Sequence, residues 1–259
     1  MDLGINGRTA IVCGSSRGIG EACAIALAEA GVDVVINGRD KDTLERAVRN
    51  IEARTGVVPT AVPADITTEA GREALLNACP EPDILINNAG APPYRDFREL
   101  DEAAIIDGLR LNMISPIALS RAVLDSMTAK GFGRIVTITS ITVKMPLYGL
   151  DLSSGARAGF TAFMAGIARS VVEHNVTINH LLPGYVDTAR MRENIDLAAA
   201  KSGRSAADIA AEREQLIPAR RFAEPAELAQ TCAFLCSTHA GYLTGQNVLL
   251  DGGLFNSTF

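Results

Sequence analysis

A glycine-rich stretch near the start of the chain carries the first residues whose spacing could support chemistry. It reads CGSSRGIG and follows the apolar run TAIVC at 9–13, with glycines at positions 14, 18 and 20. Glycines spaced in this way between a strand and a helix let the backbone approach the diphosphate of a dinucleotide at the helix N-terminus. The stretch therefore predicts a phosphate-binding loop.

The same residues also match a second pattern. GSSRG at 14–18 fits the nucleophile elbow G-x-S-x-G of α/β-hydrolases, in which Ser16 would be the nucleophile and His239 its base. An elbow normally follows several strands, whereas this loop follows the first, and Gly20 has no role in an elbow. The position of the loop thus favours nucleotide binding over hydrolysis.

Two arginines near the loop indicate which dinucleotide it would bind. Gly38 and Arg39 stand about twenty residues after the loop, where a carboxylate would bind the ribose 2′-hydroxyl of NAD. A cation at this corner favours a 2′-phosphate, and Arg17 adds a second positive charge inside the loop. The alternative is that both arginines are merely solvated. The sequence predicts NADP(H) as cofactor, with NADPH preferred over NADH.

The elements that must position these residues alternate along the whole chain. Helical patterns, including a long one over 99–129, separate apolar runs. Runs that are apolar throughout and separated by helices are typical of a parallel sheet covered on both faces. The sequence predicts one α/β domain over 1–259, a doubly wound parallel sheet (Rossmann fold), in which 187–217 forms a helical substrate lid. About seven strands are expected, at 9–13, 33–37, 57–63, 83–87, 133–140, 176–182 and 246–253.

Composition excludes several other classes of function. The net charge of −6 argues against a nucleic-acid partner, which requires clustered Lys and Arg. No run of about 18 apolar residues predicts a membrane span, and the N-terminus has no signal-peptide pattern. Cys232 and Cys236 share a helical face but have no further ligands nearby, so no metal site is expected. We expect a cytoplasmic protein with reduced, buried cysteines.

Taken together and in order, the motifs resemble those of the short-chain dehydrogenase/reductase family, close to the 3-oxoacyl-carrier-protein reductase type. The resemblance covers essentially the whole chain. Its markers are the three glycines, Asp65-Ile66, NNAG at 87–90, Asn112 in LRLN, Ser140, PGYVDT at 183–188, RRFAEPAELA at 220–229 and YLTGQNVLLDGG at 242–253.

The resemblance implies where the cofactor would lie. Asp65 and Ile66 would border the adenine, although Asp65 could instead be a helix cap. The segment 88–90 would lie against the ribose, and Pro183, Gly184 and Thr188 would hold the nicotinamide end. The residues expected to bind the cofactor are Gly14, Ser16, Arg17, Gly18, Ile19, Gly20, Arg39, Asp65, Ile66, Asn88, Ala89, Gly90, Arg157, Pro183, Gly184 and Thr188.

The catalytic segment departs from the family pattern. By resemblance, Ser140 would orient the substrate carbonyl, and Asn112 would kink the long helix and order a water, unless it is a satisfied core amide. A tyrosine and a lysine should follow Ser140, but LSSGARAGF at 152–160 places Ser153 and Arg157 at their positions. Serine is a far weaker acid than a phenol of pKa about 10. Arg157 could still fork onto the ribose hydroxyls but cannot give up its proton. The standard acid is therefore missing.

Other side chains could replace it. Tyr148 is the best substitute, since it stands in the loop KMPLYGLD between Ser140 and the helix; the alternative is a tyrosine that merely lines the pocket. Lys144, Asp151, Tyr185 and His180 are further candidates. Apolar side chains in the same region suggest a substrate that is not highly charged; these are Met145, Leu147, Leu150 and Leu152.

Three classes of function stay open. The first is an NADP(H)-dependent oxidoreductase of a small carbonyl, alcohol or imine substrate with a non-standard proton donor. The others are a non-redox enzyme such as a lyase or dehydratase, and a catalytically silent nucleotide-binding protein. By resemblance, the chain would form homotetramers or dimers through the helices at 99–129 and 153–173 and the C-terminal strand region. Small residues on the second helix would permit close packing; these are Ala158, Ala162, Ala165 and Gly166.

Overall fold

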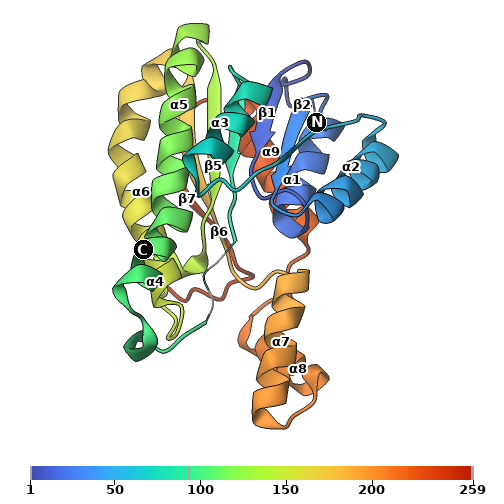
Figure 1. The fold of residues 1–259 in the computed structure, drawn as a ribbon, viewed down its shortest axis with the longest axis vertical. Coiled ribbons are helices and arrows are strands. Elements are labelled where there is room, and N and C mark those ends of the chain that lie inside the picture. Colours follow the sequence, from blue (N-terminus) through green and yellow to red (C-terminus); the bar gives the residue numbers. More distant parts are fainter. Residues whose placement is uncertain (1, 91, 93, 258–259) are drawn as a thin grey trace.

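Parallel strands form a single seven-stranded sheet in the computed structural model, which describes residues 2–90, 92 and 94–257 (Figure 1). Their order across the sheet is β3-β2-β1-β4-β5-β6-β7. The chain thus works outward from β1 in both directions, as a doubly wound fold requires, and the predicted fold class is confirmed. The strands are β1 (Thr9–Val12), β2 (Asp33–Gly38), β3 (Thr60–Pro63), β4 (Ile84–Asn87), β5 (Gly133–Ile138), β6 (Val176–Pro183) and β7 (Asn247–Leu250).

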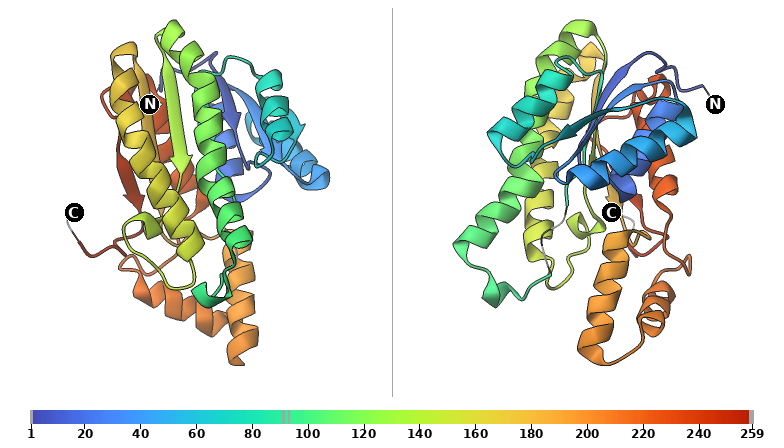
Figure 2. Two further views of the ribbon diagram at one scale, coloured as in Figure 1. Left: turned by 60° about the vertical axis from the view of Figure 1, so that its left-hand side comes forward. Right: turned by 45° about the vertical axis from the view of Figure 1, so that its right-hand side comes forward.

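Helices cover both faces of this sheet (Figure 2). On one face pack α1 (Gly18–Glu29), α2 (Lys41–Thr55) and α9 (Pro225–Cys236). On the other pack α3 (Glu69–Ala78), α5 (Ser115–Lys130) and α6 (Asp151–Val171), with α4 (Glu102–Leu109) preceding α5.

The two helical layers explain why the strands are apolar throughout. Ile135 and Val136 are neighbours on β5, yet they belong to the apolar clusters on opposite faces. Successive strand side chains point to opposite faces, so a sheet covered on both faces buries every one. The five cysteines are free and buried within these layers, as predicted.

Capping residues fix where several helices begin. The Asp40 carboxylate accepts a hydrogen bond from Thr43 N at 2.9 Å and so caps α2. Thr68 and Thr188 accept in the same way from Gly71 N and Met191 N. Thr188 thereby starts α7 (Ala189–Ser202) directly after β6. Among the described side chains, none caps α1 in this manner.

The long helical region predicted over 99–129 is interrupted. A wider, π-helical turn, Arg110–Ile114, separates α4 from α5 and holds Asn112 in a buried position. Ser115 Oγ donates to Arg110 O at 2.7 Å across this turn. The kink expected at Asn112 is therefore present.

By length and composition alone, Glu102–Lys130 could cross a membrane. In the fold, its residues Leu119, Val123 and Met127 are fully buried against the sheet. Only 33% of its most apolar window is buried, however, so the region also presents an exposed apolar face.

The segment 187–217 is helical, as predicted. It forms α7 and α8 (Ala206–Leu216), which project from the edge of the sheet at which the strands end (Figure 1). Ile195, Ala199 and Ile209 form a small apolar cluster between them. Its role as a substrate lid remains a prediction.

Candidate active site

The loop between β1 and α1 fits tightly against the segment that follows β4. Asn88 Nδ2 donates to Gly14 O at 2.9 Å and to Cys13 O at 3.3 Å. Gly14 has a φ of +56°, and a Cβ on Gly20 would lie 2.3 Å from Gly14 O. Neither position can carry a side chain without displacing the loop.

This loop leaves the N-terminus of α1 open. Arg17 is the N-cap residue and, within the described chain, no side chain accepts from the first N–H groups. Free N–H groups at a helix N-terminus attract an anion. A Cβ on Gly18 would lie 3.5 Å from Thr188 Cγ2, so the start of α7 borders the same site. The structure thus brings together the glycine loop, Asn88 and Thr188, and their role in cofactor binding stays a prediction.

Ser16 lies against Gly38, the residue before Arg39, at the corner where a 2′-phosphate would lie. A Cβ on Gly38 would stand 2.8 Å from Ser16 Cβ, so the end of β2 touches the loop. Burial raises the pKa of Asp65, but hydrogen bonds from Thr67 and the charge of Arg39 outweigh it and lower that pKa overall. Arg39 is itself exposed.

Arg17 has only a weak partner. Its guanidinium lies 3.5 Å from Glu193 Oε1, and both side chains are largely exposed. Such a surface pair contributes about 0–1 kcal/mol, so Arg17 is free to contact an incoming phosphate.

Ser140 follows β5 at the same edge of the sheet. Its Oγ accepts a hydrogen bond from Thr142 N at 3.1 Å, which starts a short 3₁₀ turn. The backbone N–H occupies an oxygen lone pair, and the hydroxyl hydrogen remains available to a substrate carbonyl.

Ser153 and Arg157 lie one turn apart on the buried side of α6. Arg157 Nε donates to Ser153 Oγ at 3.0 Å, and its Nη1 donates to Ile138 O and Thr139 O at 2.7 and 2.9 Å. Arg157 is 6% exposed. Burial, and then the charge of Arg190, lower the pKa of Arg157 to about 10. The guanidinium thus ties the end of β5, just before Ser140, to α6.

Tyr148 is held away from the role of acid. Its hydroxyl donates to Asp96 Oδ2 at 2.5 Å, and the residue is 61% exposed. The hydrogen bond to the Asp96 carboxylate raises the pKa of Tyr148. In this arrangement the phenol is a weaker acid than a free tyrosine.

The other candidate donors are Lys144, His180, Tyr185 and Asp151. Lys144 Nζ lies over the Phe255 ring, 5.6 Å from its centroid. Burial lowers the pKa of His180 to about 4, and its ring packs edge-on against Phe160 in the core, so it is neutral near pH 7. Tyr185 packs against Phe222. Asp151 Oδ2 accepts from Gly149 N at 3.2 Å.

A small cavity of about 10 Å³ connects the catalytic segment to the cofactor segment. Asn112, Arg157 and Ala89 all line it. Asn112 Nδ2 has no hydrogen-bond partner among the described residues, so Asn112 is not the satisfied core amide of the alternative interpretation.

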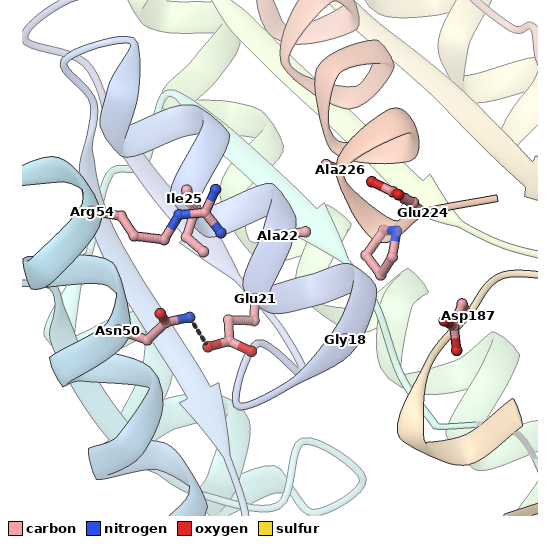
Figure 3. A pocket seen from close by; sticks show the side chains of 10 residues that line it. Gly18, Glu21, Ala22, Ile25, Asn50, Arg54, Asp187, Glu224 and Ala226 are labelled. Carbon is pink, nitrogen blue, oxygen red and sulfur yellow. Dashed lines mark hydrogen bonds between the residues drawn. The ribbon is translucent and has the colours of Figure 1, made fainter. Parts of the chain in front are cut away.

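A cavity of about 400 Å³ lies behind the glycine loop between α1, α2 and α9 (Figure 3). Glu21, on this groove, accepts from Asn50 Nδ2 at 2.7 Å. Asp187, also on the groove, pairs with Arg192. Of the predicted site residues, only Gly18 lines the groove.

The hydrolase alternative is wrong. His239 Nε2 bonds to Asp2 O at 2.8 Å, in the segment that precedes β1 and packs near the start of β2. Ser16 touches Gly38 at the opposite end of β2. Nucleophile and base would be separated by the length of a strand.

Sequence reasoning missed two residues of the site. Arg190 follows Thr188 by two positions, and its Nη2 donates to Pro92 O at 3.1 Å, just past the NNAG segment. Its position beside the predicted nicotinamide contact could have identified Arg190 from the sequence. Nothing in the sequence indicated Asp96 as the partner of Tyr148, because 52 residues separate the two.

Comparison with known proteins gives a consistent picture. A family model described as enoyl-(acyl carrier protein) reductase matches residues 14–255. The 3-oxoacyl-[acyl-carrier-protein] reductases of Aquifex aeolicus and Escherichia coli are 30% and 32% identical, over 98% of this chain and 100% and 99% of theirs. The L-sorbose reductase of Gluconobacter frateurii, solved with NADPH and L-sorbose, superposes with a TM-score of 0.93 at 29% identity, covering 99% of this chain and 100% of its own.

Proposed function

The chain belongs to the short-chain dehydrogenase/reductase family of oxidoreductases, and from this premise we propose that it is an NADP(H)-dependent reductase of a small carbonyl compound. One observation carries the proposal. The glycine loop, Asn88 and Thr188 surround an open helix N-terminus, with Ser140 at the same edge of the sheet. NADPH, when bound there, would supply a hydride.

The residues of the loop fit that cofactor. Gly14 and Gly20 permit close backbone approach, and the first N–H groups of α1 can bind the diphosphate. Arg39 and Arg17 offer cations for a 2′-phosphate. The L-sorbose reductase that superposes on this chain was solved with NADPH, which supports the same choice.

Ser140 would polarise the substrate carbonyl, since its hydroxyl hydrogen is free to donate. The alkoxide formed on hydride transfer needs a proton. Ser153 is a weak acid, Arg157 keeps its proton, and Tyr148 is bonded to Asp96. We therefore assign the proton to solvent water, in place of the family's tyrosine.

NADPH consumption across a panel of small ketones, aldehydes and imines tests the proposal, with product analysis run beside it. Oxidation of NADPH with equimolar alcohol or amine is expected. Product formation without NADPH loss would instead support a lyase or dehydratase, and NADPH binding without any product would support a silent nucleotide-binding protein.

A further inference from the structure

Arg157 presents an unusual electrostatic problem. It is 6% exposed, yet no carboxylate in the described part of the chain lies within salt-bridge distance. Nε and Nη1 bond to neutral oxygens, and Nη2 has no hydrogen-bond partner among the residues described. A buried guanidinium without a counter-ion is costly unless a bound anion compensates it.

Arg190 approaches the same segment from the other side. Its Nη2 donates to Pro92 O, three residues past Ala89, and Ala89 shares the small cavity with Arg157. Arg190 is exposed, whereas Arg157 lies at the base of the site. The two guanidinium groups are close enough for the charge of Arg190 to lower the pKa of Arg157.

The acids nearby are directed elsewhere. Asp187 forms a bidentate pair with Arg192, both oxygens at 2.8 Å. Glu193 lies 3.5 Å from Arg17 on the surface, and its charge opposes the effect of burial on the pKa of Arg190. No carboxylate of the described chain acts on Arg157 in this way, so the positive charge beside Ser140 and Ser153 that lacks a counter-ion is that of Arg157.

We propose that Arg157 and Arg190 form an oxyanion-binding site for the substrate, and that the substrate is an oxo acid whose carboxylate they bind. This inference rests on the proposed function and specifies its substrate class. Within the described chain, Arg157 has Nη2 free to donate and Arg190 can add a second donor, so a carboxylate could accept one charge-assisted hydrogen bond from each guanidinium. An apolar body on the acid would still suit the loop side chains Met145 and Leu147, so the expected low substrate charge is replaced by a single terminal charge.

The anionic parts of the cofactor have binding groups of their own, and the ribose hydroxyls expected beside Arg157 are neutral, so they would not compensate its charge. The diphosphate fits the free N-terminus of α1, and the 2′-phosphate fits Arg39 and Arg17. Arg157 is on α6, where it bonds to the backbone next to Ser140 and to Ser153. An anion held there would be part of the reacting molecule.

Calorimetric titration of the protein saturated with NADP⁺ tests the assignment without requiring turnover. The probes are pyruvate, acetoacetate and levulinate, each compared with its methyl ester. At least one acid is expected to bind about tenfold or more tightly than its ester, as for a charge-assisted pair. Equal binding of acid and ester in all three pairs would overturn the proposal.

Variants of the exposed arginine sharpen the test, because Arg190 contributes one backbone contact and its loss leaves the core intact. Arg190→Gln should bring the acid-to-ester ratio close to one, and Arg190→Lys should restore part of it. Arg192→Gln, on the same helix but paired with Asp187, is the matched control and should leave the ratio unchanged. If Arg190→Gln weakens NADPH instead and the ratio persists, Arg190 serves the cofactor diphosphate and the proposal fails. If the protein binds the acids more tightly than the esters but never oxidises NADPH, the proposed reductase function is contradicted and the anion-binding site is still supported.

Discussion

At the scale of single residues, the replaced pair on α6 decides the chemistry. Ser153 and Arg157 stand where the family resemblance places a tyrosine and a lysine. The pair holds a strand end in place, since Arg157 donates to Ile138 O and Thr139 O. Its contribution is therefore positioning of Ser140 and a local positive charge, with no acid strength near neutral pH.

Ser153→Ala and Tyr148→Phe should each lower kcat by less than about tenfold. Neither hydroxyl is proposed as the acid, and removal of a general acid costs about 10²–10⁴-fold. Ser140→Ala should lower kcat by about 100-fold, because it removes the hydrogen-bond donor to the substrate carbonyl. Steady-state kinetics with NADPH measures all three. A fall of 100-fold in Tyr148→Phe with NADPH affinity preserved would instead identify a relocated tyrosine acid.

Arg39→Asp should weaken NADPH binding by about tenfold or more and leave NADH binding unchanged or stronger. A charge-assisted contact to the 2′-phosphate contributes about 1–3 kcal/mol, and a carboxylate would repel that phosphate. Calorimetry with both cofactors is the measurement, and Arg49→Asp on the exposed side of α2 is the control. Unchanged preference in Arg39→Asp would contradict the assignment.

The limits of sequence reasoning at this scale are physical. Position relative to Ser140 identified Ser153 and Arg157, because spacing along one strand and helix is local. The Tyr148–Asp96 hydrogen bond joins two loops 52 residues apart, and nothing local encodes it. The same holds for the bonds from Arg157 Nη1 to Ile138 O and Thr139 O at the end of β5, because backbone carbonyls have no signature in residue type.

At the scale of elements, the β1–α1 loop and the segment after β4 behave as one unit. Asn88 bonds to the carbonyls of Cys13 and Gly14, and Gly20 packs on Gly14. Cofactor binding should therefore be sensitive to changes that separate these backbones.

Gly20→Ala should lower the free energy of unfolding by about 1–3 kcal/mol and weaken NADPH binding, because the new Cβ overlaps Gly14 O. Gly155→Ala is a matched control in α6, where nothing lies within 4 Å of the added Cβ. It should stabilise the fold by about 0.5–1 kcal/mol. Urea unfolding and calorimetry compare the two; equal NADPH affinity in both variants would contradict the predicted fit.

The alternation of apolar runs and helical patterns was sufficient to predict a doubly wound parallel sheet, and helical structure was predicted for 187–217. The interruption between α4 and α5 was predicted only through the family resemblance at Asn112. Periodicity continues across Arg110–Ile114, and the wider turn depends on tertiary contacts such as that of Gly159 with Met113.

At the scale of the whole molecule, large apolar side chains remain exposed on α4, on the π-helical turn that precedes α5, and on α6. Ile105, Ile106 and Ile114 are 44%, 41% and 50% exposed, and Phe163 on α6 is 50% exposed. These are the helices for which the sequence predicted an interface between copies. Exposed apolar surface of this kind marks protein contacts.

We expect a homotetramer or dimer by light scattering at micromolar concentration. Phe163→Glu should shift the protein toward species with fewer subunits, because burying a charge at an apolar interface is costly. Phe234→Glu, on α9 and 37% exposed, is the control and should leave the assembly intact. A monomeric wild-type protein would rule out this interface.

The central claim is that the site transfers a hydride despite lacking the family's acid. Single turnover with NADPH deuterated at the transferring C4 position measures this directly, with the best carbonyl substrate of the panel. The account predicts one deuterium on the carbinol carbon of the product and one NADP⁺ per product, with slower product formation in Gly20→Ala, the variant expected to bind NADPH more weakly. Product that carries no deuterium while NADPH is conserved would contradict it.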